Sequence, residues 1–413
     1  MQICIFEDEK YKNFYPLTYS RPVYDLVCGI KSIKEKIIEE FPEASFILHC
    51  RKYLENIVKS YNQKCNVNGI NGNECLFING RVSSINGLKK LADSIGKDDV
   101  VYKNGGTVII AKLSGQNLSR RINQLPEIVS SNFFDGVKER EIDIKCYNYL
   151  WEMISENGEK IKSDIEKAVK NNKYKISGKY DGVSFVEKGN IFLGKNVTIK
   201  PGVVVDATKG PVLIDGNTFI FPNAVIEGPV YIGKNSQIKS GAAINENVSI
   251  GSVCKIGGEV EDSVILSYSN KQHSGFIGHS YLGSWVNLGA DTNCSDLKNN
   301  YSTVKVNLNG KSIDTGLQFL GVIIGDHSKT AINTMFNTGT VVGFSSNIFG
   351  AGFPPKYIPS FSWGGFKGLS EYDLQKGLET ARIVMKRRDV EFLPADKEVF
   401  ENIFNLTADE RNG

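Results

Sequence analysis

The chain has 413 residues, 49 Lys and Arg against 46 Asp and Glu, and a formal net charge of +3. This length predicts two or more domains, and the balanced, scattered charge indicates no nucleic-acid or anionic-membrane partner. The first residues are typical of a strand rather than a signal peptide, and no apolar run is long enough to span a bilayer. Eight cysteines form no Cys-x-x-Cys pair and no zinc spacing, which indicates a reducing, cytoplasmic location.

Residues 1–156 alternate strand-like and helix-like segments, which predicts an α/β, Rossmann-like domain with a mostly parallel sheet. The expected strands lie at 2–6, 46–50, 75–80 and 107–111, and the expected helices at about 31–41, 53–61 and 147–155. Catalytic residues in such sheets lie beyond the carboxyl ends of the strands. We therefore expect Glu7, Asp8, Asn79 and Arg81 at the candidate crevice, although Glu7 and Asp8 are also compatible with plain acidic loop residues.

Residues 16–22 read Pro-Leu-Thr-Tyr-Ser-Arg-Pro and are followed by Gly29. This segment resembles the signature of sugar-1-phosphate nucleotidyltransferases, which implies a nucleotidyltransferase-like domain and a phosphate contact for Arg21. The alternative for Arg21 is a structural role in fixing the Pro-flanked turn. The chain departs from that family in two places. No Gly-rich phosphate loop precedes Pro16, and Asn79 stands where the family has an aspartate for Mg2+. Mg2+ is therefore expected only if this domain is active.

Residues 157–184 are polar and Lys-rich, and they predict a linker. Residues 185–353 carry a six-residue rhythm, seen most clearly in isoleucines at every sixth position: Ile214, Ile220, Ile226, Ile232, Ile238, Ile244, Ile250 and Ile256. This period fits neither an α-helix nor a flat strand, and it predicts a hexapeptide-repeat, left-handed parallel β-helix. In that fold three hexads close one triangular coil, and the aliphatic residue points to the axis. The rhythm is absent between Asp291 and Phe319, which predicts one long loop, and such loops are usually functional.

Residues 354–413 break the six-residue rhythm and predict a helical tail. Ser370-Glu-Tyr-Asp373 is typical of a capping box that opens a helix ending near Arg388, and a short helix follows Pro394. We expect this tail to cover the open end of the β-helix, whose last coil would otherwise expose unpaired strand edges.

Histidines are scarce, and two of the four, His273 and His279, precede the sequence Asn287-Leu-Gly-Ala290. This stretch resembles the acetyltransferase half of the bifunctional N-acetylglucosamine-1-phosphate uridyltransferase / glucosamine-1-phosphate acetyltransferase family. In that family an Asn follows the catalytic His by fourteen residues, and His273 and Asn287 keep this spacing without a gap. His279 is the alternative base, because Gly278-His-Ser-Tyr281 mimics the family's His-x-x-Tyr with one residue deleted. A surface histidine is the alternative for His273.

The resemblance implies acyl-CoA-dependent acetyl transfer to an amino-sugar phosphate or nucleotide, with a histidine as general base. It implies Asn287 as a polar contact and backbone groups of Ala290 and Ala331 as the acetyl-CoA slot. The expected substrate-binding residues are Lys271, Asp296, Lys298 and Lys305 of the β-helix half, together with Arg21 and Asp8 of the first domain. Asp296 stands where the family has an amide, and Glu261 stands about where it has a phosphate-binding lysine.

The resemblance also implies a homotrimer, with each site shared between neighbouring β-helices and the 291–319 loop crossing the interface. Two other functions stay open. One is sugar-1-phosphate nucleotidyl transfer from UTP or dTTP, with the β-helix as a trimer scaffold. The other is a non-catalytic sugar-nucleotide-binding assembly.

Overall fold

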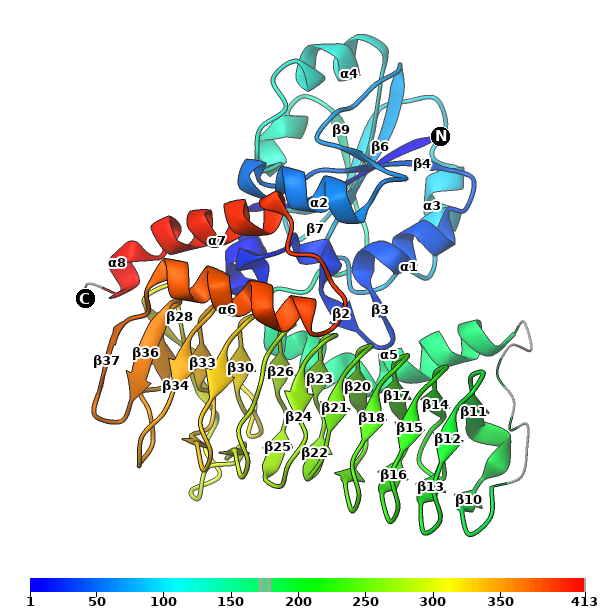
Figure 1. Cartoon of the computed structure of the whole chain (residues 1–413). Coiled ribbons are helices and arrows are strands. Elements are labelled where there is room, and N and C mark those ends of the chain that lie inside the picture. The colour runs from blue at the N-terminus through cyan, green and yellow to red at the C-terminus, as the bar shows by residue number, and fades with distance from the viewer. Residues whose placement is uncertain (171–173, 175, 177–179, 412–413) are drawn as a thin grey trace.

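The structure, a computed structural model, describes residues 1–170, 174, 176 and 180–411. Figure 1 shows an α/β domain standing on the side of a long β-helix, with the C-terminal helices packed beside both. The predicted architecture is thereby confirmed: an α/β domain, a parallel β-helix of stacked short strands and a helical tail. Among the helices of the described residues, none combines the length and apolar character needed to cross a bilayer.

The α/β domain is built on a seven-stranded mixed sheet in the order β5-β4-β1-β6-β8-β7-β9. Four strands are parallel, and β8 runs antiparallel to β6 and to β7. The strands are β1 Gln2–Phe6, β4 Ser45–Leu48, β5 Asn66–Val67, β6 Glu74–Asn79, β7 Val100–Asn104, β8 Thr107–Ser114 and β9 Lys138–Glu141. The helices are α1 Ile33–Glu40, α2 Glu55–Tyr61, α3 Leu88–Ser94 and α4 Gly115–Ile122. The alternation expected from the sequence is therefore confirmed for the parallel half.

The helix α5, Leu150–Val169, is longer than the sequence indicated. Residues 157–169, which we expected in a linker, are helical and pack on the β-helix, where Asn157 Nδ2 donates to Asn247 O at 2.7 Å. Buried Ile161 and Ile165 on this segment contact Leu213 of the β-helix, which is why the polar composition did not prevent helix formation. Residues 171–173, 175 and 177–179 of the predicted linker lie outside the described residues.

The β-helix has three faces, each a stack of short parallel strands. The first face contains β10 Ser184–Val186, β13 Val204–Asp206, β16 Val225–Glu227, β19 Ala243–Ile244, β22 Glu259–Glu261 and β25 Phe276–Gly278. The second face contains β11 Ile191–Leu193, β14 Val212–Ile214, β17 Val230–Ile232, β20 Val248–Ile250, β23 Val264–Ile265, β26 Tyr281–Leu282, β30 Ile323–Ile324, β33 Val341–Val342 and β35 Tyr357–Ile358.

The third face contains β12 Thr198–Ile199, β15 Phe219–Ile220, β18 Gln237–Ile238, β21 Lys255–Ile256 and β24 Asn270–Lys271. Backbone bridges of Asn287 to Asn270 and Lys329 continue this face into β31 Lys329–Thr330, β34 Asn347–Ile348 and β36 Ser362–Gly365. Two further coil strands, β27 Asn293–Cys294 and β32 Met335–Phe336, pair with each other. All eight isoleucines of the rhythm are 0% exposed, so the six-residue period marks the axis of the β-helix, as predicted.

The interruption of the β-helix is shorter and more ordered than the predicted 291–319 loop. The strand β27 still belongs to a coil, so the excursion spans residues 295–320. It carries an antiparallel hairpin of β28 Lys305–Leu308 and β29 Lys311–Asp314. Val306 and Leu308 are buried, and Asn309 Nδ2 donates to Lys12 O at 3.1 Å, so the hairpin packs on the α/β domain of its own chain.

The C-terminal tail does not cover the end of the β-helix, and that prediction was wrong. The coils continue to Gly365, and β37 Gly368–Glu371 closes the third face by pairing antiparallel with β36. The helices α6 Leu374–Lys386, α7 Pro394–Leu406 and α8 Ala408–Arg411 run back along the side of the β-helix (Figure 1). Their apolar side chains are buried there, where Phe400 packs on Phe344 and Phe361. The predicted capping box is also wrong, because Ser370 lies in β37 and Asp373 alone caps α6.

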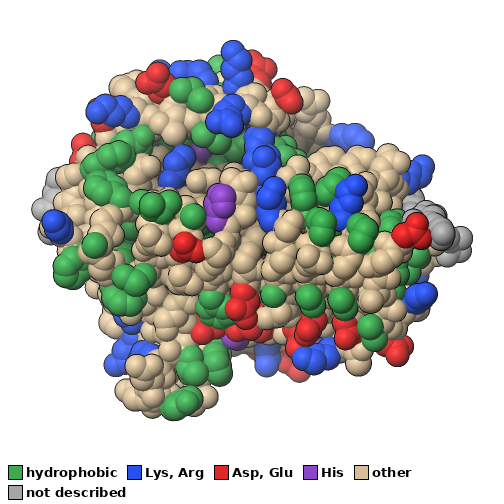
Figure 2. Space-filling view, turned by 60° about the horizontal axis from the view of Figure 1, so that its bottom comes forward, with side chains coloured by type: hydrophobic (Ala, Val, Ile, Leu, Met, Phe, Trp, Pro, Cys, Tyr) green, Lys and Arg blue, Asp and Glu red, His purple; other side chains and the backbone are tan. Residues whose placement is uncertain are grey.

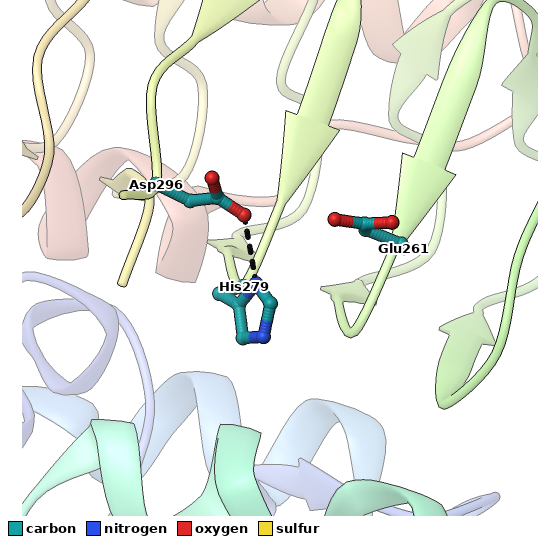
Figure 3. A group of neighbouring side chains, drawn as sticks. All are labelled: Glu261, His279 and Asp296. Carbon is teal, nitrogen blue, oxygen red and sulfur yellow. Dashed lines mark hydrogen bonds and ion pairs between the residues drawn. The ribbon is translucent and has the colours of Figure 1, made fainter. Parts of the chain in front are cut away.

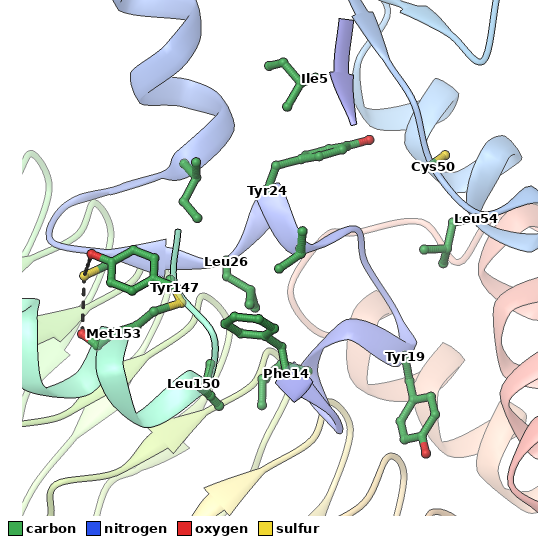
Figure 4. Packing of buried hydrophobic residues seen from close by; sticks show 14 of the residues in the cluster. Ile5, Phe14, Tyr19, Tyr24, Leu26, Cys50, Leu54, Tyr147, Leu150 and Met153 are labelled. Carbon is green, nitrogen blue, oxygen red and sulfur yellow. Dashed lines mark hydrogen bonds between the residues drawn. The ribbon is translucent and has the colours of Figure 1, made fainter. Parts of the chain in front are cut away.

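One apolar cluster joins all three parts of the chain. Figure 4 shows its N-terminal portion, in which Phe14, Leu26 and Leu150 pack together where the α/β domain meets the β-helix. The buried Tyr281 hydroxyl bonds to both the N and the O of Val27, each at 2.9 Å. The α/β domain is therefore fixed to the β-helix by shared core and polar contacts.

Candidate active site at a corner of the β-helix

His279 lies at the corner between the first and second faces, directly after β25. Its φ of +45° is unusual for a residue with a side chain, and such backbone conformations persist where the surroundings enforce them. The preceding Gly278 is required for close packing, because a Cβ there would lie 2.4 Å from Asp296 Oδ2. The backbone therefore brings an imidazole and a carboxylate together at one corner.

Two neighbours hold the imidazole in place. His279 Nδ1 lies 2.8 Å from Asp296 Oδ2 (Figure 3). The ring also stacks on Phe319 at a centroid distance of 5.1 Å. Asp296 and Phe319 stand at the two ends of the 295–320 excursion, so the excursion leaves and rejoins the β-helix beside His279. This placement gives the excursion a function in orienting the histidine.

Three carboxylates surround His279: Glu261, Asp262 and Asp296. Asp262 Oδ2 lies 3.7 Å from His279 Nε2, and one ligand atom each of Glu261, His279 and Asp296 lies within 4.8 Å of the others. Burial lowers the pKa of His279, but the hydrogen bond to Asp296 and the charges of Asp262, Asp296 and Glu261 outweigh it and raise that pKa overall. Burial, followed by the charge of Asp296, raises the pKa of Glu261. Figure 2 shows acidic side chains gathered along one edge of the β-helix.

This arrangement has two chemical capacities. A carboxylate that accepts from Nδ1–H leaves Nε2 of the neutral ring as a proton acceptor, the tautomer that a general base requires. The surrounding negative charge attracts a cation, either a substrate ammonium group or a divalent metal ion, and disfavours a phosphate.

The structure places His273 elsewhere, at the corner between the third and first faces. Its side chain is exposed, and its backbone O accepts from Lys271 Nζ at 3.1 Å. Ala290 and Ala331 lie at the same corner on the next two coils, where Asn333 N donates to Ala290 O at 2.8 Å. Asn287 lies on the third face, with its Oδ1 3.4 Å from Asn270 Nδ2. Within one chain, the predicted coenzyme residues therefore neighbour His273 and not His279.

Among the described residues, Asp296 is the expected substrate-binding residue that contacts the imidazole of a candidate base, His279. Lys271 is 1% exposed, and its ammonium donates to the carbonyls of Gly257, His273 and Ser274. Burial lowers the pKa of Lys271 to about 8. Because the ammonium group of Lys271 already donates to three backbone carbonyls, it does not fit the substrate contact we expected. Lys298 donates to Thr303 O within its own loop, and Lys305 is exposed on the hairpin.

The expected crevice of the α/β domain is filled by internal ion pairs. Asp8 pairs with Arg81 and accepts from Asn79 Nδ2 at 2.9 Å, while Glu7 pairs with Arg51 at 3.1 Å. All these side chains are buried. Because their oxygens are already bonded, the residues do not fit Mg2+, which needs free carboxylate ligands, and the substrate contact expected for Asp8 is not supported. Arg21 pairs with Asp326 of the β-helix, which agrees with its structural alternative.

Sequence reasoning missed Asp262 and Phe319. The coil length provides a signal for Asp262. Asp262, His279 and Asp296 follow one another at intervals of 17 residues, so they occupy the same corner on successive coils. Phe319 has no such signal in the sequence, because its contact with His279 depends on where the 295–320 excursion rejoins the β-helix.

Comparison with known proteins agrees with this architecture. Residues 3–173 match the family model described as "Sugar nucleotidyl transferase". The chain is 32% identical over 255 residues to the "Bifunctional sugar-1-phosphate nucleotidylyltransferase/acetyltransferase" of Sulfurisphaera tokodaii, covering 57% of this chain and 62% of that protein. It is 30% identical over 259 residues to the "Bifunctional protein GlmU" of Methanocaldococcus jannaschii, covering 58% of this chain and 61% of that protein. The chain thus aligns with about three fifths of each relative's length.

A solved structure of LpxA, a UDP-N-acetylglucosamine acyltransferase from Bacteroides fragilis, is 16% identical with a TM-score of 0.27, covering 55% of this chain and 97% of that one. This similarity is too low to bear on activity. The fold and the sequence matches define the class of the protein, a chain that joins an α/β domain matching the "Sugar nucleotidyl transferase" model to a β-helix. In particular, the chain resembles the bifunctional sugar-1-phosphate nucleotidyltransferase/acetyltransferase family, which confirms the resemblance noted in the sequence.

Proposed function

We propose that the β-helix transfers an acetyl group from acetyl-CoA to the amine of an amino-sugar derivative, with His279 as the general base. The observation that carries the proposal is the 2.8 Å contact of His279 Nδ1 with Asp296 Oδ2, which orients Nε2 as the acceptor. His273 has no such orienting partner among the described residues, so we favour His279 over the gap-free alignment.

The step is a direct transfer. The amine nitrogen attacks the thioester carbonyl carbon, the C–N bond forms, and the amine proton passes to His279 Nε2. The C–S bond then breaks, and the sulfur takes that proton as coenzyme A leaves. The carboxylates of Glu261, Asp262 and Asp296 attract the substrate as its ammonium form, which releases one proton to solvent before the neutral amine attacks, and they stabilise the imidazolium that forms.

The same carboxylates limit which acceptor substrates can bind at this corner. A phosphate beside Glu261 and Asp262 would be repelled, so the proposed acceptor is an amino sugar, or a nucleotide-linked one, whose phosphate lies away from this corner. Lys298 and Lys305 on the excursion remain the proposed phosphate contacts, because Lys305 is exposed and Lys298 lies on the same loop.

A homotrimer is part of the proposal. A three-fold assembly brings two different patches of the same chain into contact, so one corner of a β-helix faces another corner of its neighbour. The His279 corner and the Ala290–Ala331 corner are two such patches. A shared site would therefore combine the base of one chain with the acetyl-CoA slot and Asn287 of the next. We also propose a cytoplasmic location, supported by eight free cysteines.

The test compares two matched variants, His279→Ala and His273→Ala, by thiol release from acetyl-CoA over a panel of amino sugars and their phosphates. His279→Ala is expected to lose about 10²- to 10⁴-fold in rate, the usual contribution of a general base. His273→Ala is expected to stay close to wild type. The reverse result would overturn the assignment, and no thiol release from wild type with any acceptor would overturn the proposed reaction.

Nucleotidyl transfer by the α/β domain is the second candidate, favoured by the family match over residues 3–173. The buried ion pairs of Glu7 and Asp8 argue against it, because the nucleotide triphosphate and its metal would have to displace them. Pyrophosphate release from UTP or dTTP with a sugar-1-phosphate is the measurement that would favour it. Binding of sugar nucleotides without either release would favour a non-catalytic assembly.

A further inference from the structure

A cavity of about 620 Å³ lies where the α/β domain, the β-helix and α7 meet. Its walls come from residues 20–35 and 57–62, from the corner between the second and third faces, and from α7. Neither Glu7 nor Asp8 of the filled crevice lines it, and His279 does not line it either. The cavity is therefore separate from the filled crevice and from the His279 corner, while Arg21, for which the resemblance implied a phosphate contact, lies in its wall. Its size is typical of a small-molecule site.

An aromatic column forms one wall. Tyr268, Trp285 and His327 occupy the same corner position on successive coils, with Tyr268–Trp285 and Trp285–His327 centroids 4.2 and 6.1 Å apart and the rings within 14° of parallel. All three have a left-handed backbone, with φ of 68°, 63° and 62°. Three earlier coils fill this position with Asn, a residue that tolerates this conformation well, at Asn196, Asn217 and Asn235. Val253 holds it on the coil before Tyr268, and Ser345 on the coil after His327. Of the residues at this position, the cavity lining contains the three with rings, Tyr268, Trp285 and His327, and not Val253 or Ser345, which points to a use for the rings.

Polar atoms in the wall lack partners. Arg21 Nε and His327 Nδ1 are buried and have no hydrogen bond within the described residues, although buried polar atoms are nearly always paired. His327 is 8% exposed, and burial, followed by the charges of Lys329 and Arg21, lowers its pKa well below the usual value. Its ring is therefore neutral at pH 7, with one nitrogen a donor and the other an acceptor. The wall thus holds unused hydrogen-bonding capacity beside flat apolar rings.

The charges of the lining exclude an anionic ligand. The cations are Arg21 and Lys34, and both are ion-paired, Arg21 with Asp326 and Lys34 with Asp25 at 2.5 Å. Glu35 and Asp396 add two further carboxylates to the wall. The lining is therefore net negative and offers no unpaired cation to a phosphate within the described residues, whereas its carboxylates and serine hydroxyls suit a ligand with hydroxyl groups.

We propose that this cavity binds an uncharged nucleoside, with the flat heteroaromatic base against the Tyr268–Trp285–His327 column and the sugar hydroxyls on the carboxylates and serines. Each part of the ligand is complementary to one feature of the wall. The base matches the aromatic rings and the unpaired polar atoms, the hydroxyls match the oxygens, and the absence of a phosphate matches the net negative lining. The site is independent of the proposed acetyl transfer, since no residue of the His279 corner takes part.

Isothermal titration calorimetry of the full chain tests this site. The ligands are the common nucleosides, their 5′-monophosphates, and ribose as an uncharged sugar without a base. At least one nucleoside is expected to bind with a Kd below about 1 mM, its monophosphate to bind several-fold more weakly, and ribose not to bind. No nucleoside binding, or tighter binding of the monophosphate, would overturn the proposal.

Two variants locate the binding. Tyr268→Ala removes one ring of the column and is expected to weaken binding by roughly tenfold, as for the loss of one base–aromatic contact. Ser252→Phe, at another lining residue, narrows the cavity without removing a ring and is expected to abolish binding. Tyr301→Ala, an exposed tyrosine on the excursion, is the matched control and should bind as wild type does. Unchanged binding in Tyr268→Ala and Ser252→Phe, each with a wild-type thermal midpoint, would place the ligand elsewhere and refute the site. Thiol release measured on the same preparations reports separately on the proposed acetyl transfer.

Discussion

Asp296→Asn is the sharpest perturbation of the candidate active site. It replaces one oxygen by an NH2 group and keeps the size of a side chain that is 8% exposed. What it removes is the negative charge 2.8 Å from His279 Nδ1. Phe319 still stacks on the ring, so the imidazole should stay in its place while it loses the partner that fixes its tautomer.

The expected loss in rate follows from that contact. A hydrogen bond to a charged group contributes about 1.5–3 kcal/mol, and the loss of such an amount from the transition state slows turnover by roughly 10- to 100-fold. The pH dependence has a defined sign. Asp296 raises the pKa of His279, so Asp296→Asn lowers it. Because only the neutral ring acts as a base, the acid limb of the pH–rate profile should move to lower pH while the plateau falls.

Initial rates of thiol release from pH 5 to 9 measure both effects, and the imidazole proton signals in an NMR titration measure the pKa of His279 directly. His279→Ala identifies its signal among the four histidines. Asp314→Asn, which removes an exposed carboxylate from the same excursion, is the control and should leave the profile unchanged. An acid limb that stays in place, or moves to higher pH, in Asp296→Asn would refute the role given to Asp296.

Three further predictions concern stability, each measured by chemical denaturation followed by circular dichroism. Lys271 has its pKa lowered from 10.5 to about 8 in the folded chain, so the unfolded chain holds the proton between these values and stability rises with pH there. Between pH 7 and pH 10 the free energy of unfolding of wild type should therefore rise by about 2–3 kcal/mol more than that of Lys271→Met. The control Lys305→Met should show the same pH dependence as wild type. Parallel curves for wild type and Lys271→Met would contradict the prediction. Asp8→Asn leaves the Arg81 charge buried without its counterion and should cost about 3–5 kcal/mol; a loss below 1 kcal/mol would mean that the pair is hydrated. Ile238→Ala, at a side chain that is 0% exposed, should cost about 2–5 kcal/mol, and a neutral result would contradict its place on the axis.

Local chemistry that repeats along the chain could be predicted well. The isoleucines from Ile214 to Ile256 lie on the axis because each coil repeats the one before. The six-residue period in the sequence therefore predicts which side chains are buried. The first strands of the α/β domain follow from the same logic, since buried strands and amphipathic helices alternate in the sequence. The helix α5 was underestimated because the residues that bury its second half belong to the β-helix, far away in the sequence.

The choice between His273 and His279 illustrates the remaining limit. A spacing of fourteen residues between His273 and Asn287 matches the family, but spacing along the chain does not state which corner of a coil a residue occupies. The corner is decided by where each turn falls, and the Asp296–His279–Phe319 contacts form only because the excursion leaves and returns at that corner. In the same way, Glu7 and Asp8 stand at the predicted edge of the sheet, yet Arg51 and Arg81 neutralise them there.

By itself, the sequence determined the β-helix, its axis residues and the α/β character of the first domain, because these depend on periodic burial that neighbouring residues encode. Only the tertiary structure decided which histidine meets a carboxylate, that the tail lies along the side of the β-helix, and that an aromatic-walled cavity opens between the domains. These features depend on contacts between segments that are distant in the chain, and no local pattern specifies such contacts.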